Sequence, residues 1–511
     1  MPQARAFSVA LVGLDGQPVE VEAAIGGGLP RTVLVGLPDT ALYEARDRCK
    51  AAAASSGLEW PNSLVTINLS PASLPKAGSH YDIAILAAVL AAAGVTRGER
   101  LDDTVLVGEV GLDGRVRAVR GVLPAMLAAV TSGFTRAIVP ASMAHEAQLV
   151  EGVEIIGVHT VRDLVGVLDG GPVPVPEAPP SSEEPADPTP PDLLDVAGQV
   201  DARWALEVAA AGRHHIWLAG PPGVGKTMLA ERLPGLLPEL GTAESLEVSA
   251  IHSLAGRRLD GLVARPPYAA PHHSTSMASL VGGGPRLVTP GLISVAHRGV
   301  LFLDEAAEFP AKVLDALRTP LELGAVTIGR SQVQARFPAD FQLVVASNPC
   351  PCGMASTPGA ACTCTPMAIR RYSERLSGPI RDRVDITQVL RPIRKTFLAE
   401  AVQSAESTAV VADRVRAARE RQAYRLGGTG WSTNSAVRGS YLRNQLPLPD
   451  GLEHLDTAVS RGRLSARGVD RVLRLAWTVA DLGGRDRPSA DDLMTALSMR
   501  RGEPATTGRV A

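Results

Sequence analysis

The run Gly220–Thr227 carries glycine, lysine and threonine at the spacing GxxxxGK(S/T). In order, its residues are Gly220, Pro221, Pro222, Gly223, Val224, Gly225, Lys226 and Thr227. Glycines let the backbone turn tightly enough for successive N–H groups to face phosphate oxygens. Lys226 is then placed to reach the β- and γ-phosphates, and Thr227 to hold Mg²⁺. The pattern predicts a site for a nucleoside triphosphate such as ATP.

Two apolar stretches downstream end in residues that complete such a site. Residues 299–303 lead into Asp304 and Glu305. Asp304 at a strand end can hold Mg²⁺ through water, and Glu305 can orient or deprotonate the attacking water. Residues 341–347 lead into Asn348, whose amide could sense the γ-phosphate or position that water. Together these residues predict ATP hydrolysis.

The elements around the phosphate loop must hold it at the edge of a sheet. Residues 214–219 are predicted to form a short buried strand that enters the loop. Residues 228–233 are predicted to lie in a helix whose N-terminus faces the phosphates.

Arginines further along the chain could supply positive charge to the transition state. Residues 376–385 are predicted to end a helix and start a strand. Arg383 in this stretch is our candidate for a finger that reaches the nucleotide of a neighbouring chain in a ring. Arg467 follows Ser465 at the predicted start of a C-terminal helix, from which it could reach the γ-phosphate. The alternative for either arginine is an ordinary surface salt bridge.

Four of the five cysteines lie in one loop, at Cys350, Cys352, Cys362 and Cys364. In a reducing cytoplasm such density indicates a metal before a disulfide, and four thiolates suit tetrahedral Zn²⁺. The C-x-C spacing is tighter than the usual C-x₂-C spacing of zinc sites. Two interpretations therefore stay open, a structural zinc ion and reduced thiols in a Gly/Pro loop.

Composition limits the class of protein. The chain has 511 residues, 45% of them hydrophobic, and a formal net charge of −2. Any contact with nucleic acid must therefore come from a local basic patch. No apolar run is long enough to span a membrane, and the first residues lack the hydrophobic region of a signal peptide. We expect a cytoplasmic protein with no membrane segment.

A proline-rich stretch, residues 171–192, divides the chain as an extended linker. Residues 1–170 alternate short apolar runs with helical ones and are predicted to form an α/β domain. Residues 193–395 carry the phosphate loop and are predicted to form an α/β ATPase core. Helical periods dominate residues 396–511, which are predicted to form a helical lid.

Longer motifs in the core carry a family resemblance. They are residues 265–274 and 280–284, residues 290–297 before the acidic strand, and Asn348–Gly353 after the third strand. These resemble the magnesium-chelatase-like AAA+ ATPases, and the ComM/YifB branch over nearly the whole chain. The resemblance implies a hexameric ring with hairpin insertions lining a pore, and an ATP-driven motor for branch migration of DNA in homologous recombination and natural transformation. The alternative is an ATPase subunit of a magnesium-chelatase-like complex that inserts metal.

Residues 326–337 alternate well enough to predict a β-hairpin with its turn at residues 329–332. By the same resemblance this hairpin lines the pore. Arg330 at the tip would then meet DNA phosphates, with Arg336 at the far end as a second candidate. The alternative is a surface hairpin with solvated arginines.

Residues 5–168 resemble the Lon-protease-like domain found beside recombination ATPases, on the motifs 68–82 and 108–114. A Lon peptidase needs a serine nucleophile and a lysine base. The resemblance places His80 at the nucleophile position and Leu123 at the base position. We therefore expect no peptidase activity, although Ser79 lies next to the first position.

Overall fold

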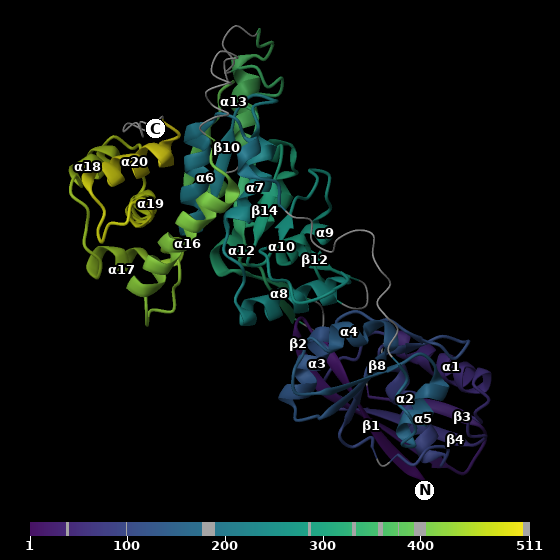
Figure 1. Ribbon diagram of the computed structural model, residues 1–511. Coiled ribbons are helices and arrows are strands. Elements are labelled where there is room, and N and C mark those ends of the chain that lie inside the picture. The colour runs from purple at the N-terminus through teal and green to yellow at the C-terminus, as the bar shows by residue number, and fades with distance from the viewer. Residues whose placement is uncertain are drawn as a thin grey trace.

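The computed structural model describes residues 1–36, 40–98, 100–175, 190–284, 288–329, 334–355, 361–376, 378–392 and 405–503. The N-terminal segment, the middle segment with the phosphate loop, and the C-terminal helices follow one another across the molecule (Figure 1). Among the residues described, no helix is both long and apolar enough to cross a membrane.

The N-terminal segment is built on a mixed seven-stranded sheet with the order β3-β4-β2-β1-β5-β8-β9. The strands are β1 Gln3–Val12, β2 Asp15–Gly26, β3 Arg31–Val35, β4 Leu64–Ser70, β5 Thr104–Leu106, β8 Arg136–Pro140 and β9 Glu154–Val158, with a small hairpin of β6 Glu109–Val110 and β7 Val116–Arg117. Among the short apolar runs of residues 1–170, those at 33–35, 65–69, 104–107 and 136–139 are predicted to be strands, and the structure confirms them as β3, β4, β5 and β8. The β1–β2 hairpin, which is not among the predicted elements, turns at Gly13, where φ is +68°.

Helices cover this sheet. They are α1 Thr40–Ser55, α2 Asp82–Ala92, α3 Val122–Thr131, α4 Ala144–Ala147 and α5 Val161–Leu168, with a short 3₁₀ turn η1 Ala141–Met143. Helix α2 is buried at all but one of its positions, as its unbroken apolar sequence requires. Its one carboxylate, Asp82, is paired with the guanidinium of Arg48 through bonds of 2.8 and 2.9 Å.

The middle segment has a parallel five-stranded sheet with the order β11-β14-β17-β10-β18. The strands are β10 Ile216–Ala219, β11 Tyr268–Ala269, β14 Val300–Leu303, β17 Gln342–Ser347 and β18 Ile386–Val389. Strands β14 and β17 are buried at every position, as expected of parallel strands covered on both faces. Because the carboxyl ends of parallel strands share one edge, the loops after β10, β14 and β17 meet there.

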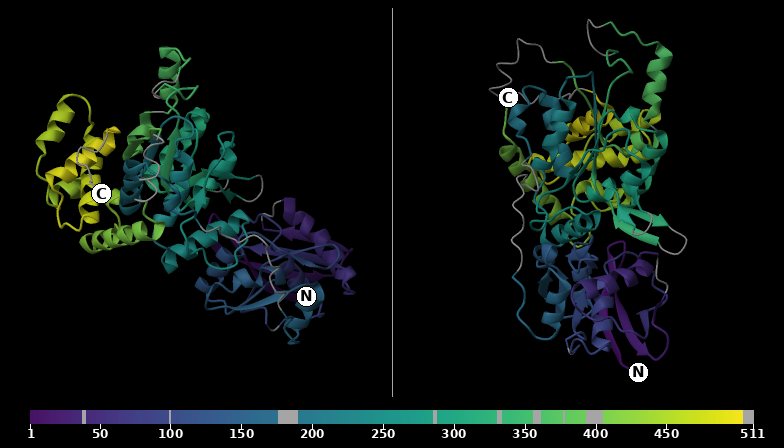
Figure 2. Two further views of the ribbon diagram at one scale, coloured as in Figure 1. Left: turned by 45° about the horizontal axis from the view of Figure 1, so that its top comes forward. Right: turned by 90° about the vertical axis from the view of Figure 1, so that its right-hand side faces the viewer.

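Helices and two small hairpins complete this segment. They are α6 Val200–Gly212, α7 Lys226–Leu236, α8 Thr242–Ala255, α9 Met277–Val281, α10 Leu292–Val295, α11 Ala311–Ala316, α12 Arg318–Leu323, α13 Pro366–Arg375 and α14 Gly378–Arg383, with 3₁₀ turns η2 Leu193–Asp195 and η3 Ala306–Glu308 and the short pair β12 Gly282–Gly283 and β13 Thr289–Pro290. The predicted hairpin is confirmed as β15 Ala325–Gly329 paired with β16 Gln334–Pro338. It projects from the core beside the N-terminal segment (Figure 2, right).

The N-terminal segment packs on α8 and on the base of this hairpin. Leu11 packs against a small apolar cluster formed by Leu254, Ala335 and Phe337. A Cβ built on Gly13 would lie only 2.6 Å from the carbonyl oxygen of Arg336. The β1–β2 turn therefore fits against the hairpin at a position where only glycine leaves room.

A buried carboxylate lies in the same interface. Ser253 on α8 donates a hydrogen bond to Glu146 of the N-terminal segment, and the backbone N–H of Leu123 lies 3.3 Å from the same carboxylate oxygen. Burial raises the pKa of Glu146, while these two donors oppose the shift.

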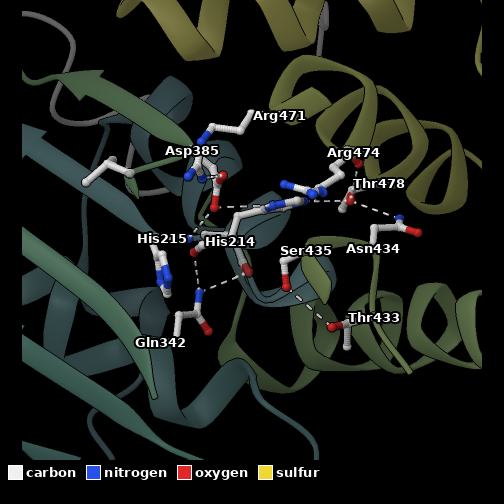
Figure 3. A network of polar contacts seen from close by, with 12 residues as sticks. His214, His215, Gln342, Asp385, Thr433, Asn434, Ser435, Arg471, Arg474 and Thr478 are labelled. Carbon is white, nitrogen blue, oxygen red and sulfur yellow. Dashed lines mark hydrogen bonds and ion pairs between the residues drawn. The ribbon is translucent and has the colours of Figure 1, made fainter. Parts of the chain in front are cut away.

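The C-terminal helices share one apolar core with the middle segment. They are α16 Thr408–Arg425, α17 Gly439–Asn444, α18 Glu453–Ser460, α19 Ala466–Leu482 and α20 Ala490–Arg501, with a 3₁₀ turn η5 Asn434–Ala436. Buried polar groups also cross the joint (Figure 3). His214 lies 2.8 Å from the hydroxyl of Thr478, and Arg471 is paired with Asp385.

Candidate nucleotide-binding site

The phosphate loop joins β10 to α7 as the sequence predicts. Gly223 and Gly225 have φ values of +76° and +92°, a conformation that glycine adopts without strain. Helix α7 begins at Lys226 with Gly225 as its N-cap, which has no side chain to bind the first backbone N–H groups. Those groups, together with the positive end of the helix dipole, form a cradle for an anion. The loop therefore fits the phosphates of a nucleotide.

Lys226 is buried within this loop. Its ammonium donates to the carbonyl oxygens of Gly220 and Pro221 at 2.7 and 2.8 Å, and to Oδ1 of Asn348 at 3.0 Å. Burial lowers the pKa of Lys226, while Asp304 and Glu305 oppose that shift. The structure thus joins the lysine of the phosphate loop to the side-chain amide of Asn348, which follows β17.

The acidic strand brings the expected magnesium ligands together. The hydroxyl of Thr227 donates to Oδ2 of Asp304 at 2.9 Å, and the backbone N–H of Glu305 donates to Oδ1 of Asp304 at 2.9 Å. A hydroxyl and a carboxylate are oxygen ligands of the type that Mg²⁺ prefers. The donor set therefore fits Mg²⁺ at this point.

Glu305 sits in an unusual backbone conformation. Its φ is +47°, in the left-handed region that is strained for a residue with a side chain. Its carboxylate is half exposed and lies 3.8 Å from Nδ1 of His273. The sequence alone indicates only a packing or ring-interface role for His273 beside His272, because no local pattern links it to an acidic strand that follows more than thirty residues later.

Gln199 is a second residue near the phosphate loop that is not among the predicted site residues. It precedes α6 with a φ of +51° and donates to the carbonyl oxygens of Val224 and Arg391 at 3.2 and 2.9 Å. A cavity of about 220 Å³ lies beside it, lined in part by Trp204 and Met499. The side chain thus ties the phosphate loop to the end of β18 next to a cavity. Its signal in the sequence was only a Gly-Gln pair before a helix.

Arg383 and Arg467 are not joined to the phosphate loop by the contacts of the described residues. Arg383 ends α14, its side chain is 11% exposed, and its guanidinium is paired with Glu322 of α12. Arg467 lies in the first turn of α19 and is exposed. Arg471, one turn later, donates to the carbonyl oxygen of Arg383 at 2.9 Å.

The four clustered cysteines are brought together after β17. Their sulfur atoms all lie within 4.8 Å of one another, and the group could hold a metal ion such as zinc. Cys350 is buried and the other three are partly exposed. The close spacing of the sulfur atoms suits the first interpretation, a structural metal ion, and the reduced thiols of the second interpretation fit the same loop.

The two arginines predicted to meet DNA are placed unequally. Arg336 lies on β16 opposite Thr327, with an exposed side chain. Arg330 lies outside the residues that the structure describes.

On this parallel sheet, a phosphate loop, a strand that leads into two carboxylates and a third strand that leads into Asn348 define a P-loop ATPase core of the AAA+ class. Three family models match the chain: magnesium chelatase subunit ChlI over residues 192–397, subunit ChlI of Mg-chelatase over residues 21–143, and the ChlI C-terminal model over residues 405–500.

Proteins that are similar to this chain over nearly their whole length indicate the branch of the family to which it belongs. An uncharacterized protein of Mycobacterium tuberculosis is 51% identical over 510 residues, covering 98% of this chain and 99% of the relative. The uncharacterized protein YifB of Escherichia coli is 39% identical over 493 residues, 96% of each chain. The competence protein ComM of Haemophilus influenzae is 38% identical over 505 residues, 98% of each chain. The chain belongs to the ComM/YifB-type, magnesium-chelatase-like AAA+ family, a membership that indicates ATPase activity with ATP and Mg²⁺.

Proposed function

We propose that this protein is a hexameric ATPase that couples ATP hydrolysis to translocation on DNA, with branch migration in homologous recombination and natural transformation as its task. One observation carries the proposal. Strand β16 of the projecting hairpin continues through a short link into β17, and Asn348, the residue that follows β17, lies beside the ammonium of Lys226. A change at the γ-phosphate can therefore reach the hairpin through a single strand. The name of ComM, a competence protein, supports the same task.

In this proposal, bound MgATP supplies the phosphoanhydride bond that is broken. The N-terminus of α7 and Lys226 hold the phosphates, while Thr227 and Asp304 hold Mg²⁺. Glu305 takes a proton from water as the water oxygen bonds to the γ-phosphorus and the bond to ADP breaks. Asn348 positions that water or the γ-phosphate. The cavity beside Gln199 and Trp204 accepts the nucleobase.

The ring is proposed to complete this site. Arg383 of one chain would approach the nucleotide of the next after leaving Glu322, and Arg467 would act from the C-terminal helices. Both arginines then supply charge at the transition state, which is the usual role of such fingers. A further proposed cofactor is one structural Zn²⁺ ion at Cys350, Cys352, Cys362 and Cys364. The protein would work in the cytoplasm, where ATP and DNA meet.

The N-terminal segment is proposed to be a Lon-like domain without peptidase activity. Ser79 donates its hydroxyl hydrogen bond to Glu109, and the buried ammonium of Lys76 donates to the carbonyl oxygens of Gly36 and Pro71. A serine nucleophile needs a base that accepts its proton, and these contacts direct Lys76 elsewhere. Docked on α8 and the hairpin base, this segment is proposed to hold the hairpin in position.

The second candidate is an ATPase subunit of a metal-insertion complex, favoured by the chelatase family models. ATPase rates of the wild-type protein with no DNA, with single-stranded DNA and with a branched junction distinguish the two. The motor predicts several-fold stimulation, largest on the junction, and a junction-unwinding activity that requires ATP. Unchanged rates together with no DNA binding at low salt would leave the chelatase-like function as the better account.

A further inference from the structure

The sulfur atoms of the cysteine loop already have the spacing of a metal site. Sγ of Cys350 lies 3.3 Å from that of Cys352 and 3.9 Å from that of Cys362, and the last two are 3.6 Å apart. A tetrahedral zinc ion with Zn–S bonds of about 2.3 Å places its sulfurs roughly 3.8 Å apart. The loop is therefore preformed for a soft divalent ion with four thiolates, Cys364 being the fourth.

This loop also touches the nucleotide site on two sides. At one side, Cys350 follows Asn348 by two residues, and Asn348 accepts a hydrogen bond from Lys226. At the other side, a Cβ built on Gly353 would lie 2.6 Å from Cδ and 2.7 Å from Cγ of Pro222, in the phosphate loop. Gly353 closes the turn over the cluster, since its N–H donates to the carbonyl oxygen of Cys350 at 2.9 Å.

We infer that a zinc ion in the cysteine loop braces the phosphate loop and Asn348 in their nucleotide-binding geometry, so that loss of the metal weakens ATP binding. The inference rests on the proposed function, because it requires that Gly220–Thr227 binds ATP. The physical reason is local. Without the ion, four thiol groups lose their common centre, and the turn at Gly353 no longer has a fixed position against Pro222.

The test measures metal and nucleotide on the same sample. Full-length protein is purified under reducing conditions without chelator, zinc is quantified by mass spectrometry, and binding of a fluorescent ATP analogue is titrated in excess Mg²⁺. The measurement is repeated after zinc removal and again after zinc is returned. We expect one zinc per chain, at least tenfold weaker analogue binding after removal, and recovery on return.

A variant that keeps all four thiolates distinguishes a disturbed contact with the phosphate loop from a general loss of folding. Gly353→Ala retains its zinc but pushes against Pro222, and is expected to bind the analogue at least tenfold more weakly. Gly430→Ala is the matched control, since Gly430 has a φ of +81° against +80° for Gly353 and no atom near its Cβ position. The double variant Cys362→Ser, Cys364→Ser should lose the metal and bind the analogue as weakly as the protein from which zinc has been removed.

Each other outcome overturns the inference. Less than about 0.2 zinc per chain after zinc is supplied excludes the metal site. If the purified protein contains a full equivalent of zinc but binds the analogue equally well after the zinc is removed, the bracing is excluded. Unchanged analogue binding in zinc-loaded Gly353→Ala excludes it as well. Zinc-loaded wild-type protein that binds no analogue overturns the proposed ATPase itself, and its full zinc content distinguishes that failure from failure of the metal site.

Discussion

The hydroxyl of Thr227 donates a 2.9 Å hydrogen bond to Asp304, which lies 77 residues further along the chain. Two strands of the parallel sheet, β10 and β14, bring these residues together with β17 between them. In the proposed site the pair holds Mg²⁺, and Glu305 next to it activates water. The order of the strands therefore places Thr227 beside Asp304 and Glu305.

Substitutions in this site should separate binding from turnover. Lys226→Ala removes the ammonium that is proposed to bind the phosphates, and it is expected to abolish ATP binding. Glu305→Gln keeps the shape but not the base, so it should bind ATP normally and hydrolyse it about 100-fold or more slowly. Glu308→Gln, three residues later on the exposed side of η3, is the control. Binding titrations and steady-state phosphate release check both, and a wild-type rate in Glu305→Gln would remove it from the mechanism.

Arg383 forms an ion pair with Glu322 of its own chain. This pairing supplies a second variant with which to test whether Arg383 acts on the nucleotide of a neighbouring chain. Arg383→Ala mixed one to one with wild-type subunits should reduce the ATPase rate well below half, because each mutant chain disables its neighbour. Glu322→Gln removes this ion pair and should leave the rate at or above that of wild type. A mixture that retains half of the wild-type rate would show that Arg383 does not act in trans.

His252 should make the core sensitive to mild acid. It is buried on α8, lies 3.0 Å from the carbonyl oxygen of Val295, and burial lowers its pKa to about 4. The unfolded chain binds a proton near pH 6.5 while the folded chain does not, so the free energy of unfolding falls as pH falls. The loss between pH 7.5 and 5 is about 2 kcal/mol.

His252→Gln keeps a donor without the titration, so urea unfolding at both pH values should show that difference between wild type and variant. Asp82, whose pKa burial raises to about 6, acts in the opposite direction and cancels in the comparison. His454→Gln on the exposed face of α18 is the control. An equal pH response in His252→Gln and wild type would contradict the assignment.

The hairpin arginines should contribute to DNA binding through phosphates. Arg336→Glu, and Arg330→Glu at the predicted tip, are expected to weaken single-stranded DNA binding and to reduce its salt dependence by about one unit of slope per arginine. Arg416→Glu, an exposed arginine on α16, is the control. Fluorescence anisotropy at several salt concentrations measures both effects. If the dependence of DNA affinity on salt concentration is unchanged in these variants, the hairpin arginines do not bind DNA phosphates.

Local sequence patterns were sufficient to predict much of this fold. The phosphate loop, the strands β14 and β17 and the β15–β16 hairpin were predicted because each is a short apolar run bounded by residues of known geometry. The β1–β2 hairpin was missed although residues 19–22 alternate valine and glutamate, the signal of a half-buried strand.

Distant pairings could not be predicted in this way. Glu322 beside Arg383, His273 beside Glu305 and Ser253 beside Glu146 lie in elements whose order in space follows from packing of the whole core. None of these partners has a type or spacing that differs from that of an ordinary surface residue. The same holds for Gln199, whose role depends on where β18 ends.

The polar joint between His214, Asp385 and the helix α19 limits where the molecule can bend. Separating the C-terminal helices from the core would strip Asp385 of Arg471 and His214 of Thr478, and would expose an apolar core common to both parts. Leaving such groups buried without partners is strongly unfavourable. In the proposed ring these two parts therefore move as one rigid piece, and the hinges that turn hydrolysis into a step lie between neighbouring chains.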